Sequence, residues 1–336
     1  MSKLSVTAVL LSYNCEEFIE AALESVLVQD YEEFTVLVSD DASTDGTFSA
    51  LRHTIGNYDG PLDITLNRRQ FNSGSKTAHL NDVLRLVTSE IVISFDGDDV
   101  ARPQRISRIV EEFQLYDNVQ AVYSSYSFID RQGNNTGPAE VPHPEPHDNI
   151  QEWFARVDAY AAGSTLAFRR SVFEIFGPMD PKVNEDMILP FRASLLGEVK
   201  FVDKDLVRFR RHTESLTTDV HSLDSLRAFR ERYFSGIAMA RKSADVRLAD
   251  IETALTLESE RADELTELRV TVLLSRDNAV RTGGLLDKRL LIRLKTLFDL
   301  FRTGAYARER LQHLLLAISP DLYVRVQRFR IVRKVS

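Results

Sequence analysis

The sequence predicts an α/β domain with a mostly parallel sheet and helices on both of its faces, followed by an α-helical C-terminal region. Strand-like and helix-like segments alternate through the first part of the chain. The strand-like segments are almost continuously apolar, which is typical of parallel strands that are buried on both faces. From about residue 219 onward, glycine becomes scarce and the pattern predicts long helices. We therefore expect two domains, residues 1–218 and residues 219–336.

Predicted strands and helices follow one another in order. The expected strands cover Val6–Ser12, Phe34–Ser39, Leu62–Asn67, Ile91–Phe95 and Val119–Phe128. The helices between them cover Glu16–Gln29, Thr47–Thr54, Lys76–Thr88 and Pro103–Tyr116. Asn14 is the expected N-cap of the first helix, and Pro103 stands in the first turn of the last. Residues 131–149 are rich in Gly, Pro and Asn and predict a surface loop, in which His143 and His147 face solvent rather than a metal.

The C-terminal region predicts two long helices, at Leu223–Ala240 and Ala244–Val280. After the sequence RTGGLLDK, shorter helices are expected at Leu285–Phe301 and Glu309–Ile318. The second long helix has a mostly apolar face, formed by Leu248, Ile251, Leu255, Ala262, Leu265, Leu268 and Val272. The pattern fits a helical hairpin or a short coiled coil, but Glu258 and Arg269 fall on heptad core positions and disfavour a strict coil.

The charge is distributed unevenly. The formal net charge is −8, yet residues 288–336 carry 12 Lys and Arg against 3 acids, which leaves −17 on the rest. An acidic body argues against general nucleic-acid binding, whereas a basic tail suits an anionic membrane surface, a phosphate-bearing acceptor or an acidic partner. The single cysteine, Cys15, excludes an internal disulfide and is expected to be a buried spectator. Because no apolar stretch is long enough to span a membrane, we expect a cytoplasmic protein.

Polar clusters follow the first four predicted strands. They are SYN at 12–14, DDASTDGT at 40–47, FNSGS at 71–75 and DGDD at 96–99. Ligands of open parallel sheets bind beyond the carboxyl ends of the strands. We therefore expect the four clusters to converge on one ligand site.

The DGDD cluster indicates a cation site. Asp96, Asp98 and Asp99 would repel one another, and their pKa values would rise unless a cation neutralised them. Mg²⁺ and Mn²⁺ take oxygen ligands and are often completed by substrate phosphates, and Gly97 would let the backbone approach a ligand closely. The alternative is a solvated turn or a helix cap. Because neither a G-x-G-x-x-G loop nor a P-loop occurs, a nucleotide would have to bind in another way.

Three stretches together resemble a known family. The N-terminal VTAVLLSYNCEEFIEAALESVLVQDY, then VLVSDDASTDGT, then ISFDGDDVARP are similar to the family 2 inverting glycosyltransferases of GT-A fold. The resemblance covers roughly residues 4–218. It implies a Rossmann-like GT-A domain, a nucleotide-sugar donor and Mn²⁺ or Mg²⁺ as cofactor.

The resemblance also implies roles for individual residues. The nucleotide and its diphosphate would be held by Leu11, Tyr13, Asp41, Lys76, Asp96, Arg210 and Arg211. The metal would be held by Asp98 and His212, with Asp96 beside them. Within these sets, Asp41 would accept a hydrogen bond from the base and Asp96 would lie near the ribose. The alternatives are an exposed lysine at a helix start for Lys76 and a surface histidine for His212.

The stretch PKVNEDMILPFRA at 181–193 resembles the acidic pair that opens a helix beneath the acceptor in this family. The resemblance makes Asp186 the general base, with Glu185 beside it. An inverting transfer needs one base to deprotonate the attacking hydroxyl, and partial burial raises the pKa of a carboxylate toward that role. The alternative is that both residues only favour a helix N-terminus. Residues 163–165 resemble the acceptor-side strand of the family.

The expected function is metal-dependent, inverting transfer of a sugar from a UDP- or dTDP-sugar to a hydroxyl of a glycan or lipid-linked glycan, in polysaccharide biosynthesis of the cell envelope. Two other classes stay open: a non-catalytic sugar-nucleotide-binding scaffold that acts through its helical tail, and a metal-dependent nucleotidyltransferase. The C-terminal helices either pack on the catalytic domain or pair two subunits into a homodimer. Residues 288–334 are a candidate for peripheral contact with the inner face of the cell membrane.

Overall fold

The computed structural model describes residues 4–145, 148–156, 161–211, 226–257 and 261–285. The chain divides into two compact units, one of residues 1–212 and 249–268 and the other of residues 213–248 and 269–336. The predicted boundary between residues 218 and 219 lies outside the described residues, so the division at that point stays a prediction.

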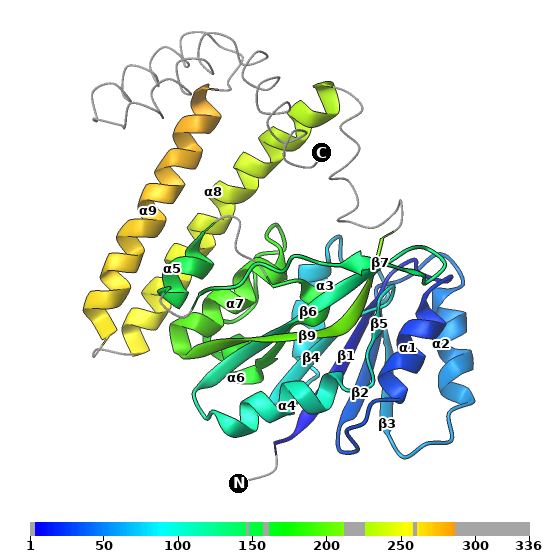
Figure 1. The fold of residues 1–336 in the computed structure, drawn as a ribbon. Helices are drawn as coiled ribbons and strands as arrows, with labels where there is room; N and C mark the ends of the chain where they lie inside the picture. The colour runs from blue at the N-terminus through cyan, green and yellow to red at the C-terminus, as the bar shows by residue number, and fades with distance from the viewer. Residues whose placement is uncertain (1–3, 146–147, 157–160, 212–225, 258–260, 286–336) are drawn as a thin grey trace, which may run out of the picture. The chain divides into compact units, whose positions relative to one another are not determined.

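One nine-stranded sheet forms the centre of the first unit (Figure 1). Its strand order is β3-β2-β1-β4-β8-β6-β9-β5, and β7 pairs with β6. The strands are β1 (Val6–Ser12), β2 (Thr35–Asp40), β3 (Asp63–Arg68), β4 (Ile91–Asp96), β5 (Val100–Ala101), β6 (Val119–Ile129), β7 (Asn135–Pro138), β8 (Ala167–Arg169) and β9 (Glu198–Arg210). The five predicted strands are confirmed as β1, β2, β3, β4 and β6.

The sheet is mostly parallel, as predicted. Strands β3, β2, β1 and β4 pair in parallel. Strand β8 is antiparallel to both β4 and β6, so β6 and its parallel neighbour β9 run in the same direction as β1. The antiparallel strands β5, β7 and β8 are only two to four residues long, too short to give a pattern in the sequence.

Helices cover both faces of this sheet (Figure 1). They are α1 (Ile19–Leu27), α2 (Thr47–Gly56), α3 (Lys76–Leu84), α4 (Arg105–Leu115), α5 (Ile150–Ala155), α6 (Arg170–Phe176) and α7 (Glu185–Leu196), with a 3₁₀ turn at Gly163–Thr165. Leu23 of α1 and Ile109 of α4 share one core with Leu10 and Val38 of the sheet. Each such fully buried side chain contributes about 1.5–3 kcal/mol, and this core holds the strand ends in place.

The predicted N-cap of the first helix is wrong. Helix α1 begins at Ile19, after a turn, and no side chain caps it. Asn14 instead has a φ of 47°, a left-handed conformation that Asn tolerates better than most residues. Its side-chain oxygen accepts a hydrogen bond from the Thr44 N–H at 2.8 Å. Asn14 therefore ties the loop after β1 to the loop after β2.

The 131–149 segment is a loop that contains β7. His143 is exposed and stacks on the ring of Phe201 at 4.4 Å, which confirms the prediction for this histidine. His147 lies outside the described residues. Cys15 is free and buried, as predicted, and burial raises the pKa of its thiol to about 12.

The C-terminal helices differ from their predicted bounds. Helix α8 (Leu226–Leu257) continues through residues 241–243, where a break was predicted, because no Gly or Pro stands there. Helix α9 (Ala262–Leu285) extends into the predicted breaker sequence. In the second unit the Arg276 Nε bonds the Asp245 Oδ1 at 2.5 Å, so the two helices pair as a hairpin.

Several expectations for this region fall outside the described residues, namely Glu258 and the predicted helices beyond Leu285. Arg269 is exposed on α9, so its heptad position is not a core position. None of the helices that the structure describes is both long and apolar enough to cross a membrane.

Candidate active site

The DGDD turn lies at the carboxyl end of β4, beside the ends of β1 and β2. In the register of the sheet, Leu11 pairs with Asp96 and Ser12 pairs with Asp40. The Gly97 N–H donates to the Leu11 carbonyl at 2.9 Å and closes the turn against β1. The polar clusters after β1, β2 and β4 thus meet at one edge of the sheet, as the sequence predicted.

Asp41 brings the remaining cluster, FNSGS at 71–75, to the same edge of the sheet. Its side chain is almost fully buried and accepts hydrogen bonds from the Ser73 N–H at 2.9 Å and the Ser73 hydroxyl at 2.7 Å. It also accepts from Asn72 at 3.1 Å and from Arg69 at 3.1 Å. The carboxylate that was predicted to contact the nucleobase therefore organises the loop after β3. A nucleobase would have to share or replace one of these hydrogen bonds.

Gly97 allows the turn to pack against the protein itself, whereas the sequence suggested close approach to a ligand. A Cβ at this position would lie 2.8 Å from the Cys15 Sγ, 3.0 Å from the Ile19 Cδ1 and 3.1 Å from the Leu11 carbonyl oxygen. Any side chain here would push Asp96 and Asp98 away from the end of β1.

The substitution Gly97→Ala is expected to lower the free energy of unfolding by about 1–3 kcal/mol, because it overpacks a closed contact. Urea denaturation measures this change. Gly56→Ala is the matched control, because its Cβ would meet nothing within 4 Å. The control should change stability by less than about 1 kcal/mol. Equal effects of the two substitutions would contradict the packing role of Gly97.

Lys76 links the DGDD turn to the acidic pair on α7. Its ammonium lies 2.7 Å from the Asp96 Oδ2 and 2.9 Å from the Glu185 Oε1. Burial alone would lower the pKa of Lys76, but the two carboxylates outweigh it and raise that pKa well above its usual range. A Cβ on Gly163 would lie 2.6 Å from Glu185 and 2.7 Å from Lys76, so Gly163, the first of the predicted acceptor-side residues, packs against this ion pair.

Asp186 stands in the first turn of α7, next to this cluster. Its Oδ1 is buried and has no hydrogen-bond partner among the described residues. Burial and, second, the Glu185 carboxylate raise the pKa of Asp186 to about 7. A carboxylate that titrates near neutral pH suits general base catalysis.

Arg210 holds the DGDD turn from the side of β9. Its N–H donates to the Asp99 Oδ1 at 2.8 Å, and its Nε donates to the Asp98 carbonyl at 2.8 Å. Its Nη1 donates to the carbonyls of residues 130 and 131, both at 3.0 Å. Arg210 is thus engaged in holding the turn, and its contact with a diphosphate stays a prediction. Burial, then Asp98 and Asp96, raise the pKa of Asp99 well above its usual range, and its Oδ1 anchors the end of β9 through the Arg210 N–H.

The remaining predicted residues differ in exposure. Leu11 is buried, while Tyr13, just after β1, is 49% exposed. Arg211 is exposed, and its guanidinium carbon lies 3.5 Å from the centre of the Phe128 ring. His212 lies outside the described residues. Tyr13 and Arg211 are therefore both accessible to a ligand.

The carboxylates fit a metal that arrives together with a diphosphate. In the part of the chain that the structure describes, no group of three or more His, Cys, Asp and Glu side chains is arranged to hold a metal. The Asp96 Oδ1 is buried and lacks a hydrogen-bond partner within that part. Mg²⁺ is commonly held by one or two carboxylates, with its shell completed by water and substrate phosphates. Asp96 and Asp98 match this kind of donor set.

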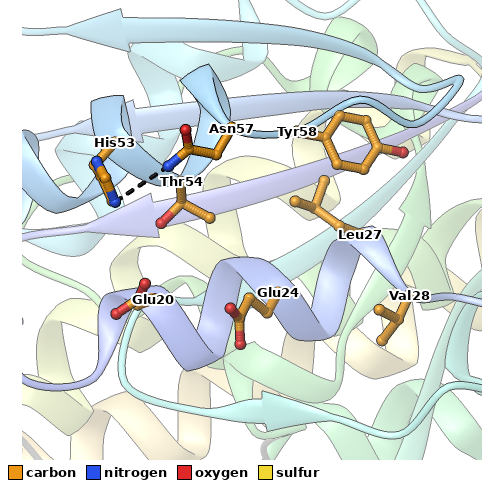
Figure 2. Close-up of a pocket in the computed structure, with 8 residues that line it drawn as sticks. All are labelled: Glu20, Glu24, Leu27, Val28, His53, Thr54, Asn57 and Tyr58. Carbon is orange, nitrogen blue, oxygen red and sulfur yellow. Dashed lines mark hydrogen bonds between the residues drawn. The ribbon is translucent and has the colours of Figure 1, made fainter.

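A separate hollow lies between α1 and α2 (Figure 2). It has a volume of about 430 Å³ and is lined by Glu20, Glu24, Leu27, Val28, His53, Thr54, Asn57 and Tyr58. None of the predicted donor, metal or catalytic residues lines it. We therefore assign no part of the reaction to it.

The sequence matches Glycosyl transferase family 2 over residues 7–176, just over half of the chain. The chain therefore belongs to this family.

Curated relatives agree with this assignment. An uncharacterised glycosyltransferase of Nostoc sp. (strain PCC 7120) is 25% identical over 215 residues, which are 62% of this chain and 65% of that protein. The glucosyltransferase WfgD of Escherichia coli is 28% identical over 147 residues, which are 43% of this chain and 55% of that protein. This chain thus spans less than two thirds of the length of either relative.

Solved structures show the same fold. The crystal structure of S. aureus TarS residues 1–349 aligns with a TM-score of 0.60 at 15% identity, covering 96% of this chain and 89% of that one. The same protein in complex with UDP-GlcNAc aligns with a TM-score of 0.54. The predicted GT-A fold with a C-terminal helical extension is therefore confirmed.

Proposed function

We propose that this chain is a metal-dependent, inverting glycosyltransferase that uses a nucleotide diphosphate sugar as donor and Asp186 as general base. One observation carries the proposal. Lys76 bonds both Asp96 of the DGDD turn and Glu185 beside Asp186, so the base stands next to the edge of the sheet where the donor would bind.

The reaction would be one displacement. The Asp186 carboxylate takes the proton of the acceptor hydroxyl, and the acceptor oxygen attacks the anomeric carbon from the face opposite the phosphate. The bond between that carbon and the diphosphate oxygen breaks, and its electron pair leaves with the diphosphate. Inversion follows from the single attack, with no second carboxylate nucleophile required.

Charge on the departing diphosphate needs stabilisation. Asp98, with Asp96 beside it, would hold a bound Mg²⁺ or Mn²⁺, and such an ion supplies Lewis-acid stabilisation of the leaving oxygens. Arg211 is the exposed cation that we assign to the diphosphate, since Arg210 is engaged in structural bonds. The ring of Tyr13 and the end of β1 would flank the base and ribose.

The relatives guide the choice of substrates. WfgD is named for transfer from UDP-Glc to a diphosphoundecaprenol-linked GlcNAc, and TarS was crystallised with UDP-GlcNAc. We infer that this chain prefers a UDP-sugar, with dTDP-sugars as the second choice. The acceptor would be a hydroxyl of a glycan or lipid-linked glycan of the cell envelope.

A cytoplasmic enzyme with a lipid-linked acceptor would have to work at the membrane. Residues 288–334, outside the described part, are our candidate for that contact, with pairing of two subunits through the C-terminal helices as the alternative. We expect the full chain to bind anionic vesicles at low salt, because each Lys or Arg near such a surface contributes about 1 kcal/mol. Sedimentation with vesicles measures this binding. A chain truncated after Asp287 should lose it, and binding that is absent or insensitive to salt would contradict the proposal.

A panel of nucleotide-sugars tests the proposed reaction. Release of nucleoside diphosphate that requires an acceptor glycan, with NMR showing an inverted anomeric configuration, would support it. Membership of the family favours an enzyme over a non-catalytic scaffold. Pyrophosphate release, which a nucleotidyltransferase would give, or retained configuration would overturn it.

A further inference from the structure

A buried ion pair joins α7 to the tip of the α8–α9 hairpin, within the first compact unit. The Arg192 Nε lies 3.0 Å from the Asp250 Oδ2, and its Nη2 lies 3.0 Å from the Asp250 Oδ1. Both side chains are buried, at 4% and 5% exposure. The third guanidinium nitrogen donates to the Gly177 carbonyl at 2.7 Å. Such a two-pronged contact fixes the orientation of both groups as well as their distance.

A second bond holds the same helix near its end. The Arg261 Nη1 donates to the Leu195 carbonyl at 2.9 Å, and its other nitrogens bond Glu264 at 3.1 and 3.2 Å. The last carbonyls of a helix lack intrahelical partners and need such donors. Residues 249–268 therefore contact the second half of α7 at two points.

The opposite end of α7 carries Asp186. Arg192 follows Asp186 by six positions, which is about 9 Å along a helix axis. Pro190 lies inside α7 and has no N–H to donate to the Asp186 carbonyl. That carbonyl instead accepts from the Ala161 N–H at 3.2 Å. Because one of its own backbone bonds is missing, the first turn of α7 depends more on outside contacts for its orientation.

We propose that the hairpin tip braces α7 and thereby positions Asp186, with Arg192 and Asp250 as positioning residues rather than catalytic ones. The C-terminal region then has a role in the reaction itself, beyond any role in membrane contact or pairing. This inference rests on the proposed function of Asp186 as base. Most of the residues expected to bind the donor belong to β1, β2, β4 and α3 or to the loops after them. Loss of the contacts between the hairpin tip and α7 should therefore slow the chemical step and leave donor binding unchanged.

The test compares Asp250→Asn with Asp245→Asn in the full chain. Asp250→Asn leaves the buried Arg192 charge without its carboxylate, and a shift of about 1 Å at a reacting group costs on the order of 100-fold. We expect kcat to fall about 10- to 100-fold while the KM for donor stays within about twofold. Asp245 pairs with Arg276 in the same hairpin but is 37% exposed, so Asp245→Asn should change neither constant by more than about twofold.

A second variant and a hydrogen-exchange measurement test the same proposal independently. If Asp250→Asn does not fold, Arg261→Gln removes the bond to Leu195 from a partly exposed residue, and we expect kcat to fall about 3- to 10-fold with the donor KM unchanged. In Asp250→Asn or Arg261→Gln, hydrogen exchange of the amides of residues 187–189 should be faster than in Asp245→Asn. A kcat that falls no further than in Asp245→Asn, or a donor KM that changes as much as kcat, would overturn the brace.

Asp186→Asn belongs in the same series, because it separates the two proposals. If Asp186→Asn stays active, the assignment of the base fails. If Asp186→Asn is inactive while Asp250→Asn and Arg261→Gln both turn over at the full rate, Asp186 remains the proposed base. Only the proposal that the hairpin tip positions it is then rejected.

Discussion

Replacing Asp186 with asparagine is expected to lower kcat by about 100- to 10,000-fold, the usual contribution of a general base. The amide cannot take the proton of the acceptor hydroxyl, yet it has nearly the same shape. Nucleotide binding should therefore stay close to that of the wild type. Initial rates of nucleotide release at saturating donor, together with calorimetric titration of nucleotide, measure both quantities.

The control for this substitution is Glu174→Gln, an exposed carboxylate on α6 that pairs with Arg170. It should leave the rate unchanged. A fully active Asp186→Asn variant would remove Asp186 from the mechanism, and an equal loss in both variants would indicate a general effect of lost charge.

The same carboxylate predicts how rate and stability vary with pH. Because burial raises its pKa from 3.8 to about 7, the rate should rise as pH increases through about 7 and the base loses its proton. The folded state holds this proton more tightly than the unfolded state. Ionisation of Asp186 therefore destabilises the fold progressively as pH rises from about 4 to above 7. Asp186→Asn should thus raise Tm more at pH 8 than at pH 4, as scanning calorimetry would show. A lower Tm at pH 8 would contradict this cause of the shift.

Lys76→Met is expected to have the second large effect. The substitution leaves Asp96 and Glu185 facing each other without the cation between them, and both carboxylates are mostly buried. We expect a loss of about 1–3 kcal/mol in the free energy of unfolding, since charged groups lose their hydrogen-bond donor. We also expect kcat/KM for donor to fall about 100-fold, because both halves of the site lose their shared anchor.

Lys182→Met is the matched control, since Lys182 is exposed in the loop before α7. Denaturation and steady-state kinetics on the two variants separate the lost bridge from the lost charge. If Lys76→Met behaves like Lys182→Met in both measurements, the ion pairs of Lys76 with Asp96 and Glu185 contribute neither to stability nor to catalysis.

The sequence predicted that the polar clusters after the strands meet, but it did not predict the contacts that α7 makes. Strands β1, β2 and β4 are long apolar runs, and each ends in a polar cluster, so their convergence follows from the topology of a parallel sheet. The resemblance to a family then gave a role to each cluster. Nothing in this reasoning required knowledge of contacts between distant segments.

The contacts that the sequence did not predict all join distant segments. Lys76 and Glu185 are far apart in the chain, as are Arg192 and Asp250, and no local pattern marks either pair. Asp41 and Arg210 were assigned to the ligand by the family pattern, but in this structure they hold loops together. An Asp or Arg at a strand end serves either purpose equally well, and only the three-dimensional contacts distinguish them. The break between α8 and α9 was misplaced because the polar residues at 241–243, of which Ser243 is buried, do not by themselves end a helix.

The most direct test is a calorimetric titration of UDP into the full chain, with and without Mn²⁺, for the wild type and for Asp98→Asn. We expect wild-type binding to need the metal, and Asp98→Asn to weaken the metal-dependent binding at least about tenfold, because the ion loses a carboxylate ligand. Binding that is equally tight without metal, or that is unchanged in Asp98→Asn, would contradict the assignment of the DGDD turn to a metal-bound nucleotide diphosphate.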